Sequence, residues 1–419
     1  MRERVTFVHA ADLHLDAPFV GIATDDERVG NALAEATYAA FEAIVDLAVD
    51  RAVDFVVIAG DAYNSADKSV RAQRRFREQV RRLDAAGIST FVVHGNHDPL
   101  SGFSAGMDLP ASVHVFPAGS VGRVEAVRDG EFVCAVYGRS FGKAAETEDF
   151  AAGYRREADD AVAVGVLHAN VGGNPDYDAY APCSLDDLRA GGMDYWALGH
   201  VHKHEVLSKD PWVVYAGSPQ GLNPKETGTH GCCLVEVQRG GAVSLEHIDL
   251  APVSWAVSTL DASAAEDVDD VEQLVGRGCE EVRGSEARPT VVRLALVGRS
   301  DAHPMLARPG AVTDLHEAVR REQAAREPWL WIDRLDDRTA APLDLDTLRA
   351  GEDFAAEVVA VADDLAAGTA GELDAMVADI GAPVADKLRG FEPTLPADEL
   401  LALARDRCLD ALLSGGDAR

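Results

Sequence analysis

The sequence has 419 residues, of which 47% are hydrophobic, and this length allows a substantial core and more than one domain. Because it holds no run of about 18 apolar residues and no signal-peptide pattern at its start, we expect a cytoplasmic protein and exclude a membrane-spanning one. The formal net charge of −32, with only six lysines among 39 basic residues, is typical of halophilic proteins from cells with molar salt inside.

The first 250 residues alternate apolar, strand-like runs with helical periodicity. Strands are predicted at Val5–His9, Phe55–Ala59, Thr90–Val93, Phe132–Tyr137, Val162–Leu167 and Tyr195–Leu198, and helices at Arg28–Val49 and Val70–Ala85. Three later runs, "WVVYAG", "GCCLVEV" and "AVSLEHI", are typical of an antiparallel sheet that closes the domain. The pattern predicts a two-layered α/β domain over residues 1–250.

The pattern changes near Trp255, where a second segment begins. An acidic stretch at Ala264–Asp270 is followed by the apolar run "PTVVRLALVG", by helical periodicity at Val312–Arg326 and by the run "PWLWIDRL". These features predict a small α/β capping domain over residues 254–342, with two strands around helices.

Residues 345–419 have helical character to the end, with breaks at "GTAG" and "FEPTLP". The last helix is predicted to begin at "LPADELL" and to end at Gly415 and Gly416. One apolar face is predicted from Leu400, Leu401, Ala404, Cys408 and Leu412. That face packs either on a helix at Asp353–Ala366 or on a partner protein, and the sequence leaves both open.

Five short motifs in the first domain are rich in Asp, His and Asn, and each follows a predicted strand. They are "DLH" with Asp12 and His14, "GDAYN" with Asp61, "GNHD" with Asn96, His97 and Asp98, "LHAN" with His168, and "GHVH" with His200 and His202. The carboxyl ends of strands form the sites of open α/β sheets, and these side chains are all of types that can bind metals. Each motif alone is more often a turn or a packed histidine, but together they predict a metal site.

A centre with two ions explains this set of ligands. Two divalent ions about 3.5–4 Å apart need a bridging carboxylate, which Asp61 can supply. Asp12 and His14 stand two residues apart, so an extended backbone directs both to one side, and the same spacing recurs at His200 and His202. With two anionic ligands the ions keep roughly two net positive charges, which suits an anionic phosphodiester.

The motifs "ADLHL", "GDAYN", "GNHD", "LHAN" and "ALGHVH" resemble, in order and spacing, those of the calcineurin-like metallophosphoesterases. "HAADLHLDAPF", "YWALGHVHKHEV" and "YAGSPQG" resemble more narrowly the SbcD-type DNA repair nucleases. Over residues 1–250 the resemblance implies a two-layered metallophosphoesterase sandwich with two divalent ions, Mn²⁺ being the family's usual metal. It implies that one ion is held by Asp12, His14, Asp61 and His202, and the other by Asp61, Asn96, His168 and His200.

By the same resemblance, His97 is the candidate catalytic residue and faces the scissile phosphate. Many relatives have an aspartate where this chain has Asn64, and an amide cannot stabilise an imidazolium by charge. His97 is therefore expected to donate a hydrogen bond to a phosphate oxygen rather than to act as a protonated acid. Asp98 is expected to hold the turn through backbone amides, and His204 either touches the substrate or is solvated.

The predicted helix "VRAQRRFREQVRR" carries six arginines and one glutamate in an otherwise acidic chain. Arg71 and Arg74 are candidate contacts to DNA. It is equally possible that this helix face is solvated and that acidic neighbours balance its charge. The family resemblance adds a third role for the helix, a homodimer contact.

The leading hypothesis for function is a metal-dependent DNA nuclease that acts in double-strand break repair as a homodimer with an SMC-like ATPase of the SbcC type. In ordinary cytosol the net charge of −32 argues against nucleic acid as substrate, but in molar salt, where charges are screened within about 3 Å, it argues little either way. The alternatives are a small-molecule phosphodiesterase or phosphatase of the same fold and a repair scaffold without activity. The complete set of metal ligands argues against the scaffold.

Overall fold

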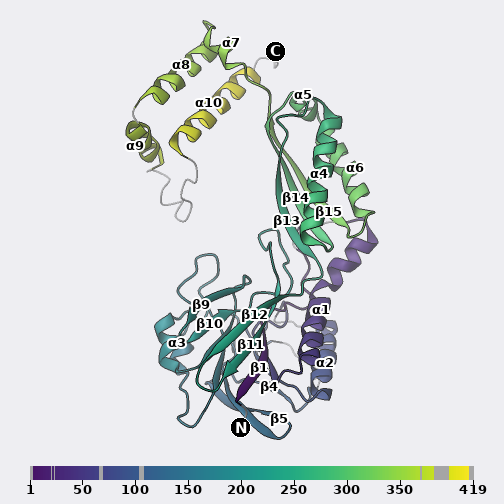
Figure 1. Cartoon of the computed structure of the whole chain (residues 1–419), viewed down its shortest axis with the longest axis vertical. Coiled ribbons are helices and arrows are strands. Elements are labelled where there is room, and N and C mark those ends of the chain that lie inside the picture. Colours follow the sequence, from purple (N-terminus) through teal and green to yellow (C-terminus); the bar gives the residue numbers. More distant parts are fainter. Residues whose placement is uncertain are drawn as a thin grey trace. The chain divides into compact units, whose positions relative to one another are not determined.

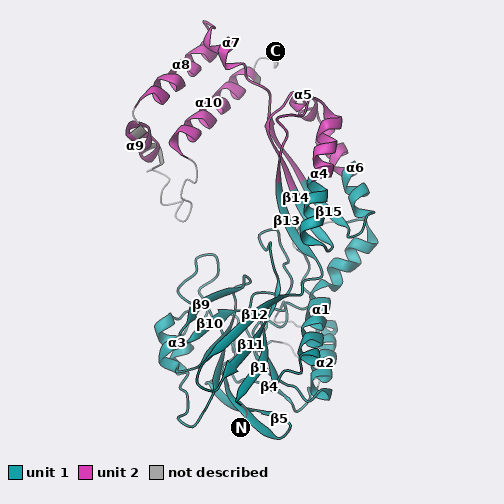
Figure 2. Ribbon diagram, viewed as in Figure 1, with its two compact units in different colours: residues 1–258, 278–293, 318–334 teal, residues 259–277, 294–317, 335–419 magenta. Residues whose placement is uncertain are grey.

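The computed structural model describes residues 3–19, 21–22, 24–65, 69–102, 108–368, 370–381 and 396–414 (Figure 1). The chain forms two compact units. One consists of residues 1–258, 278–293 and 318–334, and the other of residues 259–277, 294–317 and 335–419 (Figure 2). Among the described helices, none combines the length and the apolar character that a membrane crossing requires.

Two six-stranded sheets build most of the first unit. The first sheet has the order β12 (Val243–Asp249), β11 (Gly231–Gln238), β1 (Arg4–Ala10), β2 (Phe55–Ala59), β3 (Ser89–Val93) and β4 (Val113–Val115). The second has the order β5 (Gly122–Arg128), β6 (Glu131–Gly138), β7 (Ala163–His168), β8 (Tyr195–Gly199), β10 (Trp212–Tyr215) and β9 (Glu205–Lys209). The strands β1 to β4 run parallel, as do β6, β7, β8 and β10.

The core lies between the two sheets, where apolar side chains of both sheets form one buried cluster. Phe7 and Phe55 of the first sheet stack with ring centroids 4.8 Å apart, and Tyr195 of the second sheet meets Phe7 edge-on at 5.4 Å. Each such buried ring contributes about 1.5–3 kcal/mol. The predicted α/β sandwich is confirmed.

Two long helices cover the outer face of the first sheet: α1 (Glu27–Asp50) and α2 (Val70–Ala85). Their starts are set by side-chain caps, because Asp26 accepts hydrogen bonds from the first amides of α1 and Ser69 accepts one from α2. Phe41 of α1 stacks on Phe76 of α2 with centroids 5.5 Å apart. The short helix α3 (Leu185–Gly191) and the 3-10 turn η1 (Ala151–Gly153) pack on the second sheet through Leu188 and Ala151.

The predicted antiparallel closing sheet is confirmed only in part. The last two runs, β11 and β12, pair antiparallel but extend the first main sheet, whereas the first run, β10, belongs to the second. β10 pairs in parallel with β8 and antiparallel with β9. β11 pairs antiparallel with β1 and with β12. Alternation of apolar residues identified each strand, but it carries no information on which strand lies beside it.

A three-stranded sheet follows, with the order β13 (Ser254–Asp261), β14 (Thr290–Arg299) and β15 (Leu330–Ala340). It is accompanied by α4 (Val268–Glu286), α5 (His303–Leu306) and α6 (Ala311–Ala324). Two strands were predicted for this segment, and the structure has three. The acidic stretch leads into α4, a helix that was not predicted because its sequence is polar. The two compact units divide this segment between them, so the domain boundaries at 250, 254–342 and 345 remain predictions.

The described part of the C-terminal segment is helical, with α7 (Leu345–Arg349), α8 (Phe354–Ala367), α9 (Ala370–Gly381) and α10 (Ala397–Ser414). Helix α10 packs on α8 through Leu409, which is fully buried beside Val359. Cys408 and Leu412 of the predicted apolar face are exposed, so this part of the face does not pack on α8, and its contact with a partner protein stays a prediction. Arg299 fixes the rotation of α10 by ion pairs to its partly buried acidic side chains, Asp406 at 3.2 Å and Asp410 at 2.9 Å. The predicted end at Gly415 and Gly416 lies outside the described residues.

Candidate metal centre

The predicted ligands follow the carboxyl ends of strands from both sheets. Asp12 and His14 come after β1, Asp61 after β2, and Asn96 after β3 of the first sheet. His168 is the last residue of β7, and His200 and His202 follow β8 of the second sheet. Packing the sheets face to face brings these loops together at one edge of the sandwich.

Backbone strain marks these loops. Asp12, His14, Asp61 and His200 have φ angles of 52°, 43°, 48° and 100°, in the left-handed region that residues with a Cβ seldom adopt. Each such residue costs about 1–3 kcal/mol and persists only where its surroundings hold it. Here the loops hold each other, since the Asp12 amide donates to the Gly60 carbonyl at 3.1 Å and the His14 amide to the Asp61 carbonyl at 3.0 Å.

Two glycines make room for the ligands. A Cβ on Gly60 would lie 2.1 Å from Nδ1 of His168, and a Cβ on Gly95 would lie 2.3 Å from Oδ1 of Asp61. Neither distance is possible for real atoms. The glycines of the "GD" and "GN" motifs are therefore required by the side chains that pass over them, as well as by the turns.

Three overlapping groups of side chains are close enough to hold a cation, each with ligand atoms within 4.8 Å of one another. They are Asp12 with His14 and His202, Asp61 with His14 and His97, and Asp12 with Asp61 and His168. Each of the two carboxylates belongs to two groups. The predicted ligands Asp12, His14, Asp61, His168 and His202 are thus brought together, and His97 lies among them.

The remaining two predicted ligands border these groups. Oδ1 of Asn96 lies 2.9 Å from Nε2 of His168, which itself lies 3.4 Å from Oδ2 of Asp61. The His200 amide donates to both carboxylate oxygens of Asp12, at 3.0 and 3.1 Å. The His200 ring lies edge-on to His168, with centroids 5.2 Å apart, and its Nε2 is 2.9 Å from the Asp178 carbonyl.

The chemistry of this donor set fits divalent cations. Burial raises the pKa of Asp12 to about 6 and that of Asp61 to about 7, because a buried carboxylate without a cation is poorly solvated. The Nε2 atoms of His14 and His202 face each other at 3.1 Å. A cation between the two Nε2 atoms and the carboxylates would resolve both features.

Burial also keeps several of the imidazoles neutral, which metal coordination requires. Desolvation lowers the pKa of His14 well below its usual value, lowers that of His168, and lowers that of His200 to about 3. His202 differs. Burial alone would lower its pKa, but the hydrogen bond to Glu226 and the nearby carboxylates raise it to about 9.

Glu226 is the residue that the sequence did not reveal. Its Oε1 lies 2.9 Å from Nδ1 of His202 and accepts a hydrogen bond from the Asn223 amide group at 2.6 Å, while Oε2 accepts one from the Leu222 amide at 2.7 Å. A carboxylate on the far nitrogen of a metal-binding histidine fixes its tautomer and orientation. Glu226 stands 24 residues beyond His202 in a loop without a motif, so no local pattern could have linked them.

The surroundings of His97 differ from the expectation in one respect. Its amide donates to Oδ1 of Asp61 at 2.9 Å, and its Nδ1 lies 3.1 Å from the backbone carbonyl of Asn64, not from the Asn64 side chain. The substitution of an amide for the family's aspartate therefore does not act through this contact. Asp98 accepts hydrogen bonds from the amides of Gly95 at 2.8 Å and Tyr63 at 3.3 Å.

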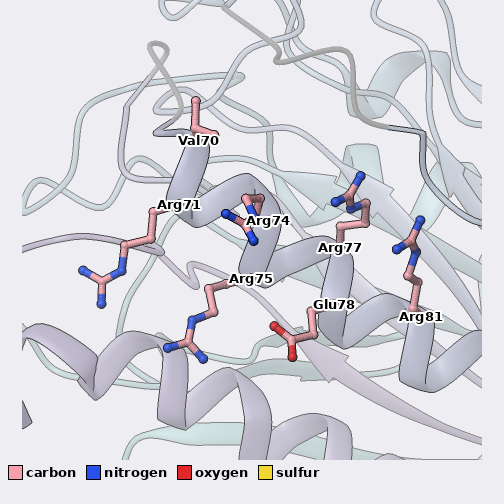
Figure 3. Close-up of a pocket in the computed structure, with 7 residues that line it drawn as sticks. All are labelled: Val70, Arg71, Arg74, Arg75, Arg77, Glu78 and Arg81. Atoms are coloured by element: carbon pink, nitrogen blue, oxygen red, sulfur yellow. The ribbon is translucent and has the colours of Figure 1, made fainter.

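The three candidate substrate contacts lie elsewhere. Arg71 of α2, which is labelled in Figure 3, forms ion pairs with Glu35 and Asp16. Arg74 is exposed on the same helix. The ring of His204 stacks on that of His247 with centroids 4.3 Å apart, and its Nδ1 is 2.9 Å from the Tyr215 carbonyl, so packing accounts for this histidine.

Two adjoining cavities open at the centre. One, of about 360 Å³, is lined by Asp61, Asn96, His97, His200 and His202 among others. The second, of about 580 Å³, shares Asp176, Tyr177, His202 and Glu226 with the first. The candidate ligands are therefore accessible to a substrate, and the accessible space continues past His202.

Comparisons with known proteins show which family this chain is similar to. Residues 5–204 match the family model of the calcineurin-like phosphoesterases, and residues 255–340 match that of the middle domain of metallophosphoesterase YhaO. The chain is 37% identical over 345 residues to the uncharacterized metallophosphoesterase YhaO of Bacillus subtilis (strain 168), covering 82% of this chain and 84% of that protein.

More distant relatives have names that refer to DNA or to a nuclease. The chain is 28% identical over 239 residues to the DNA double-strand break repair protein Mre11 of Thermoplasma acidophilum, covering 52% of this chain and 60% of that one. It is 23% identical over 304 residues to a subunit of the nuclease SbcCD of Escherichia coli (strain K12), covering 64% of this chain and 73% of that one.

The pKa shifts predict that metal binding releases protons. At pH 7, His202 with a pKa of about 9 is protonated and Asp61 with a pKa of about 7 is half protonated, and a cation must displace both protons. Affinity for Mn²⁺ should therefore rise from pH 6 to pH 9. Titration calorimetry in buffers of different ionisation enthalpy would measure the release, and a binding heat independent of buffer would contradict it.

Replacing Glu226 should weaken the centre without removing a ligand. We expect Glu226→Ala to lower Mn²⁺ affinity by about 10–100-fold, because His202 loses the group that orients it. Glu226→Gln keeps an acceptor for Nδ1–H and should lose less. Glu205→Ala, an exposed acid lining the same second cavity, is the matched control. Equal affinity in wild type and Glu226→Ala would show that His202 needs no support.

Proposed function

The chain belongs to the calcineurin-like metallophosphoesterase family, and from this premise we propose that it hydrolyses phosphodiester bonds of DNA with two divalent ions, Mn²⁺ being the expected metal. The observation that carries the proposal is the buried group of two carboxylates and several histidines at the edge of the sandwich, next to open cavities. A phosphodiesterase needs this combination of a cation site and space for a substrate.

We assign the roles as follows. Asp12, His14, Asp61 and His202 would hold one ion, and Asp61, Asn96, His168 and His200 the other. When bound, the ions supply a hydroxide at neutral pH and offset charge on the phosphoryl oxygens. Asp61 is suited to the shared position because its Oδ2 lies 3.9 Å from Nε2 of His14 and 3.4 Å from Nε2 of His168, which are assigned to different ions. Asp98 fixes the loop that carries Asn96 and His97.

His97 is the proposed catalytic residue. It lines the cavity with the ligands, and its side chain is more exposed than theirs. The Asn64 carbonyl would accept the proton on Nδ1, so Nε2 carries a lone pair in the neutral ring and donates to a phosphate oxygen only when the ring is protonated. Its proximity to His14 and Asp61 also admits a role as a ligand, and the metal content of a His97→Ala variant separates the two roles.

DNA as the substrate is supported by the names of the Mre11 and SbcCD relatives and by an arginine surface on α2. We define this surface as Arg74, Arg77 and Arg81, which share one stripe of the helix and for which the described structure gives no ion pair. In Figure 3, Arg71 and Arg75 point toward α1, where both pair with Glu35, whereas Arg77 and Arg81 point to the opposite side. Three such arginines on a chain of net charge −32 suit the phosphates of a nucleic acid.

The partners remain proposals of the same kind. The name of the SbcCD relative describes it as a subunit, which supports a complex with an SMC-like ATPase. Exposed apolar side chains on the C-terminal helices, including Val361, Leu403 and Leu413, are suited to such a contact. We also propose a homodimer, as in the family that the motifs resemble.

A small-molecule phosphodiesterase is the second candidate. The relative with 37% identity carries no DNA function in its name, and the cavity of about 580 Å³ is of a size typical for nucleotide-like ligands. The two candidates share the metal centre and differ in the length of the substrate.

Asp61→Ala should abolish hydrolysis and lower the metal content, because the substitution removes the carboxylate shared by two ligand groups. Metal analysis of the wild-type protein should give about two ions per chain, with Mn²⁺-dependent cleavage of single-stranded oligonucleotides. Asp186→Ala, at an exposed aspartate of α3, is the control. Full activity of Asp61→Ala at equal metal loading would exclude its role, and wild-type activity on mononucleotides alone would favour the second candidate.

The arginine surface should control the salt dependence of DNA binding. Each phosphate contact contributes about 0.9 to the slope of log K against log salt concentration on duplex DNA. We expect Arg74→Gln, Arg77→Gln and Arg81→Gln to lower the slope by about that amount each. Arg71→Gln, whose arginine is already paired with Glu35, should leave it unchanged. Equal slopes in all variants would place DNA elsewhere.

A further inference from the structure

The cavity of about 580 Å³ beside the metal centre contains an unusual share of the chain's lysines. The whole sequence has six, and two of them, Lys203 and Lys225, line this cavity. Lys203 comes directly after the ligand His202, and Lys225 directly before Glu226, which orients that ligand. The lysines are therefore fixed to the same two loops as the metal centre.

These two lysines also differ from the other described lysines in their contacts. Nζ of Lys143 lies 4.0 Å from a carboxylate oxygen of Glu146, and Nζ of Lys209 lies over the ring of Trp212 at 5.4 Å. For Lys203 and Lys225, both exposed, the described residues supply neither an ion pair nor a ring contact. Both ammonium groups are thus available to an anion from outside.

The carboxylate of Glu226, which lines the cavity, already has other partners. Both of its oxygens are occupied, one by His202 and the Asn223 amide group and the other by the Leu222 amide. The carboxylates of Asp176 and Glu205 and the hydroxyls of Thr227 and Thr229 complete the polar lining. The lining thus contains two ammonium groups beside three carboxylates, so an anion would bind there by direct contact with Lys203 and Lys225 and not through the net charge of the cavity.

The connection between the two cavities indicates which kind of anion would bind there. The cavity shares His202, Tyr177 and Asp176 with the cavity of the metal centre, so a ligand in one continues into the other. A substrate with its scissile phosphate at the ligands would extend past His202 toward the lysines. The volume of this cavity falls within the range of about 300–1,000 Å³ found for small-ligand pockets, which is enough for one nucleotide. Lysine binds phosphate as a point charge and tolerates varied approach directions.

We propose that Lys203 and Lys225 bind the phosphate next to the scissile one, so that this cavity receives the neighbouring nucleotide of the substrate. The inference rests on the proposed phosphodiesterase function and specifies its substrate: a chain with at least two phosphates. A nucleic acid strand is the source that we favour, and a small phosphodiester with a second phosphate, such as the 5′-(p-nitrophenyl) ester of a nucleoside 3′,5′-bisphosphate, carries the same chemistry.

The test compares substrates with one and with two phosphates. The full-length protein with Mn²⁺ would be assayed on bis(p-nitrophenyl) phosphate, which has no second phosphate, and on thymidine dinucleotides that carry a further 3′- or 5′-phosphate. Lys203→Gln, Lys225→Gln and the double variant remove the charges from exposed positions, and Lys143→Gln is the matched control. Metal content and thermal unfolding would confirm that the variants are intact.

We expect each variant to raise KM roughly tenfold for one of the phosphorylated dinucleotides, as for the loss of a charged hydrogen bond, and to leave KM for bis(p-nitrophenyl) phosphate unchanged. The dinucleotide that responds shows which side of the scissile bond lies in the cavity. Unchanged KM for both dinucleotides, or an equal rise for bis(p-nitrophenyl) phosphate, would overturn the inference.

Two further outcomes keep the proposals separate. If the wild-type protein fails to hydrolyse bis(p-nitrophenyl) phosphate with any divalent metal, the proposed function itself fails. If the lysine variants lose activity on the 5′-(p-nitrophenyl) ester of thymidine 3′,5′-bisphosphate but not on a dinucleotide, the second phosphate comes from a small molecule, and the assignment to a nucleic acid strand is overturned.

Discussion

The structure depends on the burial of two carboxylates, Asp12 and Asp61, at one edge of a sandwich of two sheets. The neighbouring groups described as shifting the pKa values of Asp12 and Asp61 most are histidines and other carboxyls. No lysine or arginine is among them. Buried anions in this situation either take up protons or bind cations. The raised pKa values describe the first state, and the surrounding imidazoles, mostly neutral, prepare the second. The fold thus maintains a site that is incomplete without cations.

The strain in the loops follows from the same constraint. Ligands that approach from two sheets must turn sharply at the strand ends, and the positive φ angles of Asp12, His14 and Asp61 are the result. Gly60 and Gly95 leave space for His168 and Asp61, and the backbone hydrogen bonds between the loops keep the geometry in place. The large apolar core between the sheets stabilises the whole arrangement, since it offsets several strained residues at about 1–3 kcal/mol each.

Sequence patterns predicted the strands, the sandwich and the ligand motifs, because each depends on local periodicity and on where a strand ends. They failed where the answer depends on contacts distant in sequence. The partners of β10 and β11 are set by packing, and the buried face of α10 is set by Leu409 and by the ion pairs of Arg299, not by the apparent apolar stripe. Glu226 was missed for the same reason, since only the fold places it behind His202.

The distribution of positive charge completes the physical picture. A chain with a net charge of −32 repels polyanions at long range unless salt screens it, and in molar salt the screening length falls to about 3 Å. Recognition of a phosphate must then be local, by cations that acidic neighbours have not neutralised. Many described arginines are paired with carboxylates, whereas the arginine surface and the lysines beside His202 are among the described cations without an ion pair. Contacts between these cations and other phosphates of a phosphodiester chain bound at the metal centre would raise the affinity of that chain.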